Sequence, residues 1–155
     1  MANLRPAQAG EAALLSSIAR AAKAHWPYTP QQLALWRDDL TVTEAMLAAH
    51  PCWVAQVGEK VIGFFLLERA ALFWTLEHLW VLPEFMGQGA GRALLAQAAA
   101  LAGKEGAVGI RIDADPYAEA FYLACGVLRT GTIAAPLEGS PDRVRPQMVL
   151  ELVAG

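Results

Sequence analysis

The sequence lacks a run of apolar residues long enough to cross a membrane, and it lacks an excess of basic residues. Glu68, Arg69 and Glu77 interrupt its richest apolar stretches, which argues against a membrane-spanning segment. Its 12 Lys and Arg residues against 15 Asp and Glu residues give a net charge of -3, so no surface for nucleic acid phosphates is indicated. We therefore expect neither a membrane nor a nucleic acid among its partners, and a small molecule is favoured.

The chain is also poor in residues that hold structural metals. Its two cysteines, Cys52 and Cys125, lie far apart and form no Cys-x-x-Cys pair, so no metal site is predicted. We expect both to be buried, as free cysteines commonly are. The first residues carry charges within their apolar stretch and lack the uncharged centre of a signal peptide, which leads us to expect a cytoplasmic protein.

The length and the apolar content suit one ordinary domain. The 55% of hydrophobic residues can form a core without support from a metal or a disulfide. No internal repeat or low-complexity segment divides the 155 residues. We predict a single domain over residues 1–155.

Periodicity predicts a short strand and two helices before residue 50. Apolar residues recur at helical spacing from Glu11 to about His25. Pro30 suits the first turn of a second helix. The residues predicted for the inner face of this helix are Leu33, Trp36 and Leu40. A turn is expected at His50-Pro51.

From Cys52 onward the pattern becomes that of strands. Segments 52–57 and 61–68 flank Gly58-Glu59-Lys60 and predict a hairpin. The segments that follow are a strand at 71–82, a helix from about 93 to Gly103, a strand at 109–114, a short helix that Asp115 caps, and strands at 127–134 and 147–153. Neighbouring strands can pair antiparallel, whereas the strand–helix–strand passage should be parallel. These elements predict a mixed α/β fold with a sheet flanked by helices.

A glycine-rich loop, Met86-Gly87-Gln88-Gly89-Ala90-Gly91-Arg92, joins the third predicted strand to a helix. The first N–H groups of a helix lack internal partners, and glycines let an anion approach them closely. The alternative is that these glycines only form a tight turn. Two other phosphate-binding loops do not fit, because one needs glycine at Arg92 and the other needs Gly-Lys followed by Ser or Thr.

Two segments resemble motifs of the GNAT (GCN5-related N-acetyltransferase) superfamily. The glycine loop resembles motif A, Gln/Arg-x-x-Gly-x-Gly/Ala, which wraps the pyrophosphate of coenzyme A; Gly89 and Gly91 match its glycines. Met86 stands where the family usually has Gln or Arg, which removes a polar side chain but no backbone donor. Downstream, DADPYAEAFYLACGV resembles motif B. The residues that match motif B are Ala120, Phe121, Tyr122 and Gly126, while Tyr117 replaces the usual Asn and Val127 the usual Phe.

This resemblance implies an acetyl-CoA-dependent N-acetyltransferase with a central mixed, mostly antiparallel sheet. The acceptor would be a primary amine of a small molecule or peptide, attacked directly in a ternary complex without a metal. The alternative is a non-catalytic acyl-CoA-binding or interaction module, which the departures at Met86 and Tyr117 support. The residues implied to contact the cofactor are Leu79, Trp80, Val81, Met86, Gly87, Gln88, Gly89, Ala90, Gly91, Arg92, Tyr117 and Phe121.

Acyl transfer to an amine requires a proton acceptor, because an amine with a pKa near ~10.4 is charged at neutral pH. The resemblance assigns Tyr122 as the proton donor to the leaving thiolate; the alternative is a core tyrosine. Strand alternation puts Glu77 on the same face as Leu79 and puts His78 on the other. In the family that this chain resembles, the face shared with Leu79 carries the proton acceptors, so the resemblance implies Glu77 as the base, acting directly or through a water. The alternatives are that Glu77 orients the substrate or pairs with Arg111, and His78 is expected in the core.

The acceptor pocket is predicted from the family alone. Trp26 and Tyr28 lie on a proline-bounded loop in the region that forms part of the acceptor wall in the family, so we expect them to contact the substrate, with Trp36 in the core. Arg143 and Arg145 lie in the last loop, for which a solvated basic loop is the favoured interpretation. Relatives often pair through sheet edges or terminal strands, so both a monomer and a homodimer stay open.

Overall fold

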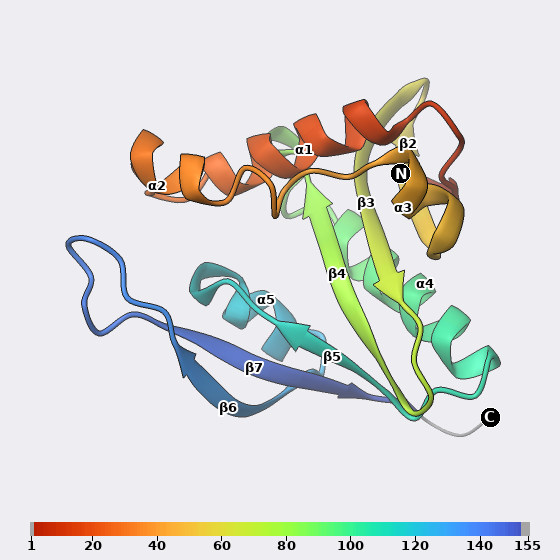
Figure 1. The fold of residues 1–155 in the computed structure, drawn as a ribbon. Coiled ribbons are helices and arrows are strands. Elements are labelled where there is room, and N and C mark those ends of the chain that lie inside the picture. Colours follow the sequence, from red (N-terminus) through yellow and green to blue (C-terminus); the bar gives the residue numbers. More distant parts are fainter. Residues whose placement is uncertain (1, 153–155) are drawn as a thin grey trace. The chain divides into compact units, whose positions relative to one another are not determined.

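The computed structural model describes residues 2–152, which form two compact units (Figure 1). Unit 1 comprises Met1–Glu68 and Glu77–Ala98, and unit 2 comprises Arg69–Leu76 and Ala99–Gly155. Strand β4 (Phe73–Val81) and helix α4 (Ala90–Lys104) each contribute residues to both units. The strand order of the seven-stranded sheet is β1-β2-β3-β4-β5-β7-β6.

Unit 1 contains the first three strands and the first three helices. The elements are β1 (Asn3–Pro6), α1 (Ala12–Ala24), α2 (Pro30–Leu35), α3 (Glu44–Ala49), β2 (Cys52–Val57) and β3 (Lys60–Glu68). Strands β1, β2 and β3 pair antiparallel in chain order. Helix α1 buries the face that carries Leu15 and Ile18, and these side chains join Val54 and Phe64 in one hydrophobic core. The helical spacing of these apolar residues therefore positions α1 against the hairpin.

Helix α3 corrects the sequence prediction, which placed only two helices before the hairpin. Thr43 caps α3 by accepting a hydrogen bond from the Met46 N–H at 3.2 Å. The carboxylate of Glu44 in turn accepts hydrogen bonds from the N–H groups of Gly10 (2.7 Å) and Ala12 (3.0 Å) at the start of α1. A capping residue and a contact with a distant helix end thus form α3 where apolar periodicity is weak.

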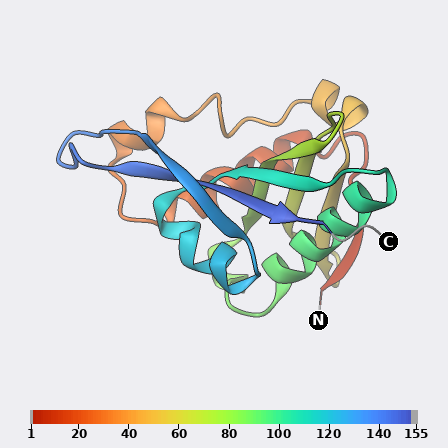
Figure 2. The same cartoon turned by 90° about the horizontal axis from the view of Figure 1, so that it is seen from below.

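Unit 2 contains the beginning of β4 and the last three strands. The remaining elements are β5 (Gly109–Asp113), the 3₁₀ turn η2 (Pro116–Ala118), α5 (Glu119–Ala124), β6 (Leu128–Ala134) and β7 (Val144–Glu151). Strand β5 pairs parallel with β4 and antiparallel with β7. Strand β6 pairs antiparallel with β7, and Figure 2 shows the two strands running beside each other. Strand β7 begins three residues before the predicted segment, and predicted residue Val153 lies outside the described residues.

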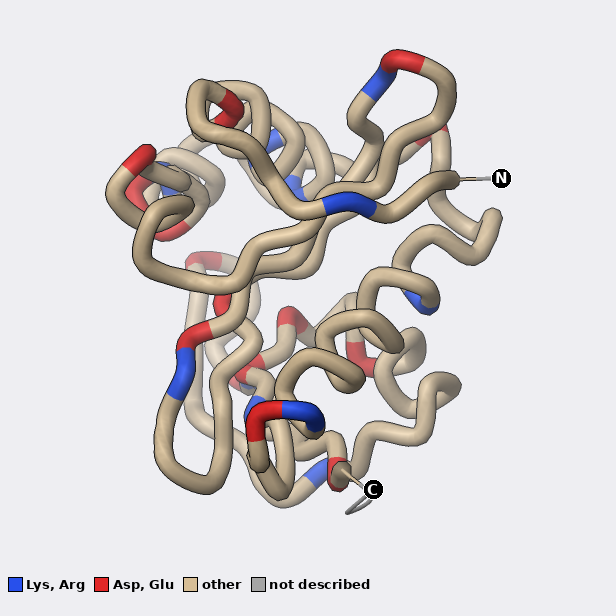
Figure 3. The backbone as a smooth tube through the Cα atoms, turned by 90° about the vertical axis from the view of Figure 1, so that its right-hand side faces the viewer, with Lys and Arg blue, Asp and Glu red and all other residues tan. Residues whose placement is uncertain are grey.

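The sheet confirms the predicted fold class: it is mixed, mostly antiparallel, and flanked by helices. Cys52 is buried as expected, whereas Cys125 is only partly buried, so that expectation was wrong for Cys125. Both are free thiols. Within residues 2–152, no helix is long and apolar enough to span a membrane, and no group of His, Cys, Asp and Glu could hold a metal ion. Figure 3 shows acidic and basic residues interspersed along the described backbone.

Candidate active site

The glycine loop follows β4 through a short 3₁₀ turn, η1 (Pro83–Phe85). The Met86 N–H donates to the Pro83 carbonyl at 3.2 Å and closes this turn. Gly87 (φ +78°) and Gly89 (φ +92°) then adopt left-handed backbone angles. A Cβ added at either glycine would meet nothing within 4 Å. The backbone angle, and not crowding, is therefore what requires glycine at these positions.

The backbone N–H groups that begin α4 are open. Among the described residues, none of the N–H groups of residues 87–91 donates a hydrogen bond. One turn into the helix, the Ala93 N–H donates to the Gly89 carbonyl at 3.0 Å. Gly87, Gln88, Gly89 and Arg92 are exposed. Open donors at a helix start, together with a nearby guanidinium, fit a diphosphate group.

The end of β4 presents two different faces within unit 1. Val81 lies beside Leu94 of α4, since a Cβ at Gly63 would be 3.2 Å from Val81 Cγ2 and 3.3 Å from Leu94 Cδ1. By strand alternation, Leu79 and the exposed Glu77 share that face. Glu77 thus points away from the face on which His78 is buried.

His78 is a core histidine, as the sequence predicts. Its side chain is 7% exposed, and its ring lies 5.7 Å from that of Phe64. Its Nδ1 accepts a hydrogen bond from Trp80 Nε1 at 3.0 Å. Burial lowers the pKa of His78 from 6.5 to about 4, and the negative charge of Asp39 opposes this shift. His78 is consequently neutral at physiological pH and has a hydrogen-bond partner.

Gly63 allows β3 to approach β4 closely near the end of β4, at Trp80. A Cβ at this position would lie 2.7 Å from the Trp80 carbonyl oxygen, which is shorter than any ordinary contact. The Leu82 N–H donates to the Ile62 carbonyl at 2.8 Å and holds the two strands together just beyond. A side chain at Gly63 would therefore displace the backbone of Trp80.

The motif B segment lies in unit 2 and carries a buried tyrosine. Asp115 caps η2, because its Oδ1 accepts a hydrogen bond from the Tyr117 N–H at 2.9 Å. Tyr122 on α5 is 7% exposed, and its ring contacts that of Phe121 edge-on at 5.2 Å. Burial raises the pKa of Tyr122, and the charges of Cys125 and Asp115 add to this shift. The phenol therefore keeps its proton well above neutral pH.

The last loop is tied to the start of motif B by a buried ion pair. The Arg143 Nη2 and Asp115 Oδ2 atoms lie 4.0 Å apart, and the two side chains are only 10% and 7% exposed. Arg143 Nη1 also donates to the Ala135 carbonyl at 3.0 Å. The interpretation as a solvated basic loop was therefore wrong for Arg143. Arg145 lies in β7 and not in a loop, but its side chain is solvated: its Nε contacts Asp113 Oδ1 at 3.0 Å in an exposed pair.

The loop between α1 and α2 gathers aromatic side chains around a lysine. The rings of Tyr28 and Trp36 lie 4.8 Å apart, so Trp36 belongs to this half-buried cluster as well as to the edge of the core. Lys23 Nζ lies 4.3 Å from the Trp36 ring centre and 5.2 Å from that of Tyr28. The ring of Trp26 instead lies against that of His25, with the two ring centres 4.9 Å apart. Lys23, which the sequence did not single out, precedes Tyr28 by five residues and Trp36 by thirteen, so the fold of the segment between α1 and α2 brings the three side chains together.

The predicted site residues divide between the two units. Unit 1 holds the β4 residues, the glycine loop, Trp26 and Tyr28, whereas unit 2 holds Tyr117, Phe121 and Tyr122. In unit 2, Tyr117 is 47% exposed and Phe121 is partly buried. Their assignment to a site stays a prediction in both units.

Comparison with known proteins identifies the family of this chain. A family model described as an acetyltransferase (GNAT) domain matches residues 48–126, which include both motifs. The chain belongs to the GNAT acetyltransferase family. It is an acetyl-CoA-dependent N-acetyltransferase, and acetyl-CoA is its acyl donor. No curated protein matches the chain.

Solved structures of the GNAT family share the fold. A GCN5-related N-acetyltransferase from Rhodopseudomonas palustris is 24% identical, with a TM-score of 0.78 over 98% of this chain and 96% of that one. The PaiA N-acetyltransferase from Thermoplasma acidophilum, solved in complex with coenzyme A, is 18% identical, with a TM-score of 0.76 over 97% and 99%. The ribosomal-protein-S18-alanine N-acetyltransferase from Escherichia coli is 19% identical, with a TM-score of 0.74 over 100% and 97%.

Proposed function

We propose that this chain transfers an acetyl group from acetyl-CoA directly to a primary amine of a small molecule or a peptide, within a ternary complex. The observation that carries this proposal is the start of α4, where the N–H groups of residues 87–91 have no partner among the described residues. These groups would hold the diphosphate of the cofactor, with Arg92 adding charge. Met86 supplies no polar side chain but removes none of these donors.

Leu79, Trp80 and Val81 are proposed to line the path of the cofactor towards the reacting thioester, which is the chemical group that acetyl-CoA supplies when bound. The close approach of β3 at Gly63 supports this role, because it holds the Trp80 backbone in one position. Backbone N–H groups of this strand would stabilise negative charge on the carbonyl oxygen of the acetyl group. Tyr117 and Phe121 are proposed as further cofactor contacts from motif B.

Tyr122 is proposed to donate its phenolic proton to the sulfur of coenzyme A as the carbon–sulfur bond breaks. Its raised pKa supports this role, because a phenol that stays protonated is ready to act as an acid. Glu77 is proposed to accept a proton from the attacking amine, directly or through a water. Its exposure on the α4 face of β4, away from His78, supports this choice.

Trp26 and Tyr28 are proposed to line the acceptor side. The Tyr28–Trp36 contact supports a formed aromatic surface there, with Lys23 as its cation. The single domain and the cytoplasmic location expected from the sequence stay predictions. The continuity of β4 and α4 through both units supports the single domain.

The direct transfer is tested by measuring coenzyme A release while both acetyl-CoA and an amine are varied, after an amine panel has identified an acceptor. Intersecting reciprocal plots are expected for a ternary complex, whereas parallel plots would indicate a covalent enzyme intermediate and contradict the proposal. Binding of acetyl-CoA without release above background for any amine would favour a non-catalytic module. Glu77→Gln should lower kcat more steeply than the control Glu59→Gln, which lies in the β2–β3 turn.

A further inference from the structure

An exposed lysine, Lys60, lies beside the segment that leads into the glycine loop of unit 1. Its Nζ is 5.5 Å from the centre of the Phe85 ring. Phe85 ends η1 and precedes Gly87 by two residues, so the Cα atoms of these two residues are at most about 7 Å apart. Within residues 2–152, Lys60 forms no ion pair, including with the exposed carboxylates of Glu59 and Glu84. Its ammonium therefore has donors to offer to an anion.

The backbone of Lys60 is held by a tight turn. Val57 and Lys60 form the last pair of the β2–β3 hairpin, and Gly58 in the turn between them has a φ of +59°. The side-chain amide of Gln56 donates to the Gly58 carbonyl at 2.8 Å, and its oxygen accepts a hydrogen bond from Arg5 Nε at 2.7 Å. Lys60 consequently extends from a turn whose geometry its neighbours fix.

A β-bulge in β3 turns Lys60 away from the core. The register of the β2–β3 pair skips Ile62, which makes it an extra residue in the ladder. Val61 and Phe64 therefore join the same hydrophobic core, although three positions separate them. Without the bulge, alternation would direct Lys60 to the side of Phe64 as well. The bulge instead directs it to the opposite face of β3, which borders α4 at Gly63.

Backbone hydrogen bonds connect this part of β3 to η1. The Leu82 N–H donates to the Ile62 carbonyl at 2.8 Å, and the Phe85 N–H donates to the Leu82 carbonyl at 2.9 Å. The contact between Lys60 and Phe85 thus joins two segments that the backbone already holds together. Because lysine carries its charge on a flexible stem, the ammonium can reach a group bound at the glycine loop without a rearrangement of the backbone.

We propose that Lys60 binds the diphosphate of acetyl-CoA and supplies the charge that Met86 does not. This inference rests on the proposed function, in which the N–H groups of residues 87–91 hold that diphosphate. Lys60 would approach it from the β3 hairpin, and an ammonium binds phosphate oxygens as a compact point charge. No motif marks this lysine, because it lies in a hairpin far from the glycine loop in the chain.

The contact is tested by calorimetry with acetyl-CoA at low salt. Lys60→Met keeps the length of the side chain and removes its charge, so it should weaken binding by about fivefold. The difference should shrink at high ionic strength. Lys60→Arg keeps the charge and should stay within about twofold of the wild-type affinity. Circular dichroism should be unchanged in both variants, because the side chain is exposed.

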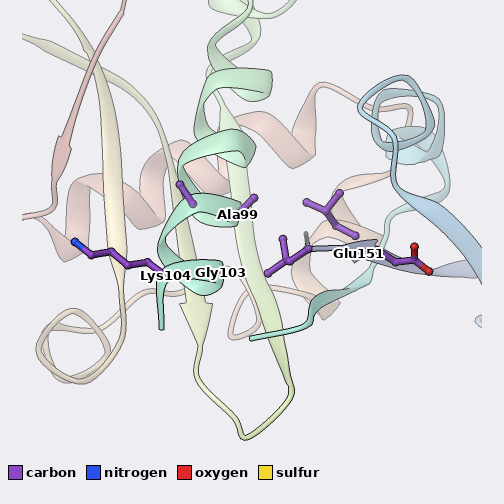
Figure 4. Close-up of a pocket in the computed structure, with 7 residues that line it drawn as sticks. Ala99, Gly103, Lys104 and Glu151 are labelled. Atoms are coloured by element: carbon purple, nitrogen blue, oxygen red, sulfur yellow. The ribbon is translucent and has the colours of Figure 1, made fainter. Parts of the chain in front are cut away.

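Lys104→Met is the matched control, since this exposed lysine ends α4, about 21 Å along the helix axis from its first residue. Figure 4 shows its side chain beside a groove of about 700 Å³ between α4 and the end of β7, which Ala99 and Leu150 also line. Loss of this charge should leave acetyl-CoA affinity unchanged. Equal losses in Lys60→Met and Lys104→Met would show that only the net charge matters, and would overturn the contact.

Two further measurements identify the phosphate group. Dephospho-acetyl-CoA lacks the ribose phosphate but keeps the diphosphate, so Lys60→Met should weaken its binding by the same factor. A loss seen only with acetyl-CoA would overturn the assignment to the diphosphate. Met86→Arg should tighten binding more in the Lys60→Met background than in the wild type, because one cation then replaces the other; equal gains would overturn this exchange of charge.

The outcomes separate this inference from the proposed function. Unchanged acetyl-CoA affinity in Lys60→Met overturns the role of Lys60 alone, because the backbone donors of the glycine loop then hold the cofactor without it. A wild-type chain that does not bind acetyl-CoA overturns both.

Discussion

The two motif segments of this chain are built in opposite ways. The glycine loop exposes Gly87, Gln88 and Gly89, and its chemistry lies in the backbone N–H groups of residues 87–91, which no described residue engages. The motif B segment, residues 113–127, is anchored by a buried ion pair, and its chemistry lies in the buried side chain of Tyr122. Loss of a polar side chain at Met86 is therefore compatible with cofactor binding, whereas motif B depends on its packing.

Because one site depends on the backbone and the other on a buried side chain, different substitutions should impair each of them. A backbone-based site is sensitive to the φ angle at its glycines and tolerant of side-chain replacement. A buried side-chain site is sensitive to the loss of one functional group or one supporting charge. Substitutions in the two segments should consequently affect different measured quantities.

The largest effect is expected for Tyr122→Phe, which removes the proposed proton donor and keeps the ring. We predict a fall in kcat of about 10²-fold or more, since a general acid contributes at least that much. Because burial raises the pKa of Tyr122, the wild-type kcat should show no descending limb from this phenol below about pH 10. Acetyl-CoA affinity by calorimetry should stay within about twofold; an unchanged kcat would remove Tyr122 from the mechanism.

The next effect concerns stability. Arg143→Gln should lower the free energy of unfolding by about 2–3 kcal/mol, because it leaves the carboxylate of Asp115 buried without its cation. Arg145→Gln is the matched control and should cost less than about 0.5 kcal/mol, although its ion pair is shorter, because that pair is exposed. Urea denaturation measures both. Equal losses would show that burial does not distinguish the two arginines.

Gly89→Ala is expected to weaken acetyl-CoA binding by about tenfold. At φ +92° an alanine costs about 1–2 kcal/mol, so the loop would relax and its N–H groups would turn away from the diphosphate. Gly131→Ala in β6, where φ is not positive and the added Cβ has open space, should leave binding unchanged. Calorimetry with acetyl-CoA separates the two variants, and full affinity in Gly89→Ala would show that the loop does not depend on this angle.

The smallest effect is expected for Met86→Arg. A guanidinium at this partly exposed position should tighten acetyl-CoA binding by about threefold at low salt, since solvent-accessible charge pairs contribute under about 1 kcal/mol. The gain should disappear at high ionic strength. Met86→Leu keeps the apolar character and serves as control. A much larger gain would mean that the missing side chain, and not the backbone, limits affinity in this chain.

The sequence predicted most elements of the fold because their signals are local. Apolar runs on either side of a turn identified β2 and β3, and Asp115-Pro116 marked the start of the motif B helical segment, where the structure places Asp115 as the cap of η2. The order of elements then predicted a mixed sheet with one parallel pair. Helix α3 escaped prediction, because its support from Gly10 and Ala12 comes from residues far away in the chain.

The candidate site residues also divide into those that local sequence signals predicted and those that depend on distant segments. The loop residues and Tyr122 were named from motifs, and the alternation of β4 correctly separated Glu77 from His78. The burial of Arg143 had no local signal, because a charged residue in a polar loop is usually exposed. The cluster of Lys23 with Tyr28 and Trp36 likewise depends on how α1 and α2 meet.

Residue identity alone thus decides where this chain can adopt positive φ, where its strands alternate and which helix begins with open donors, since each property depends on a few neighbouring residues. The protonation of Tyr122 and His78, the buried pair of Arg143 and Asp115, and the groove between α4 and β7 were decided by tertiary structure. Desolvation and packing space arise from segments that meet only after folding.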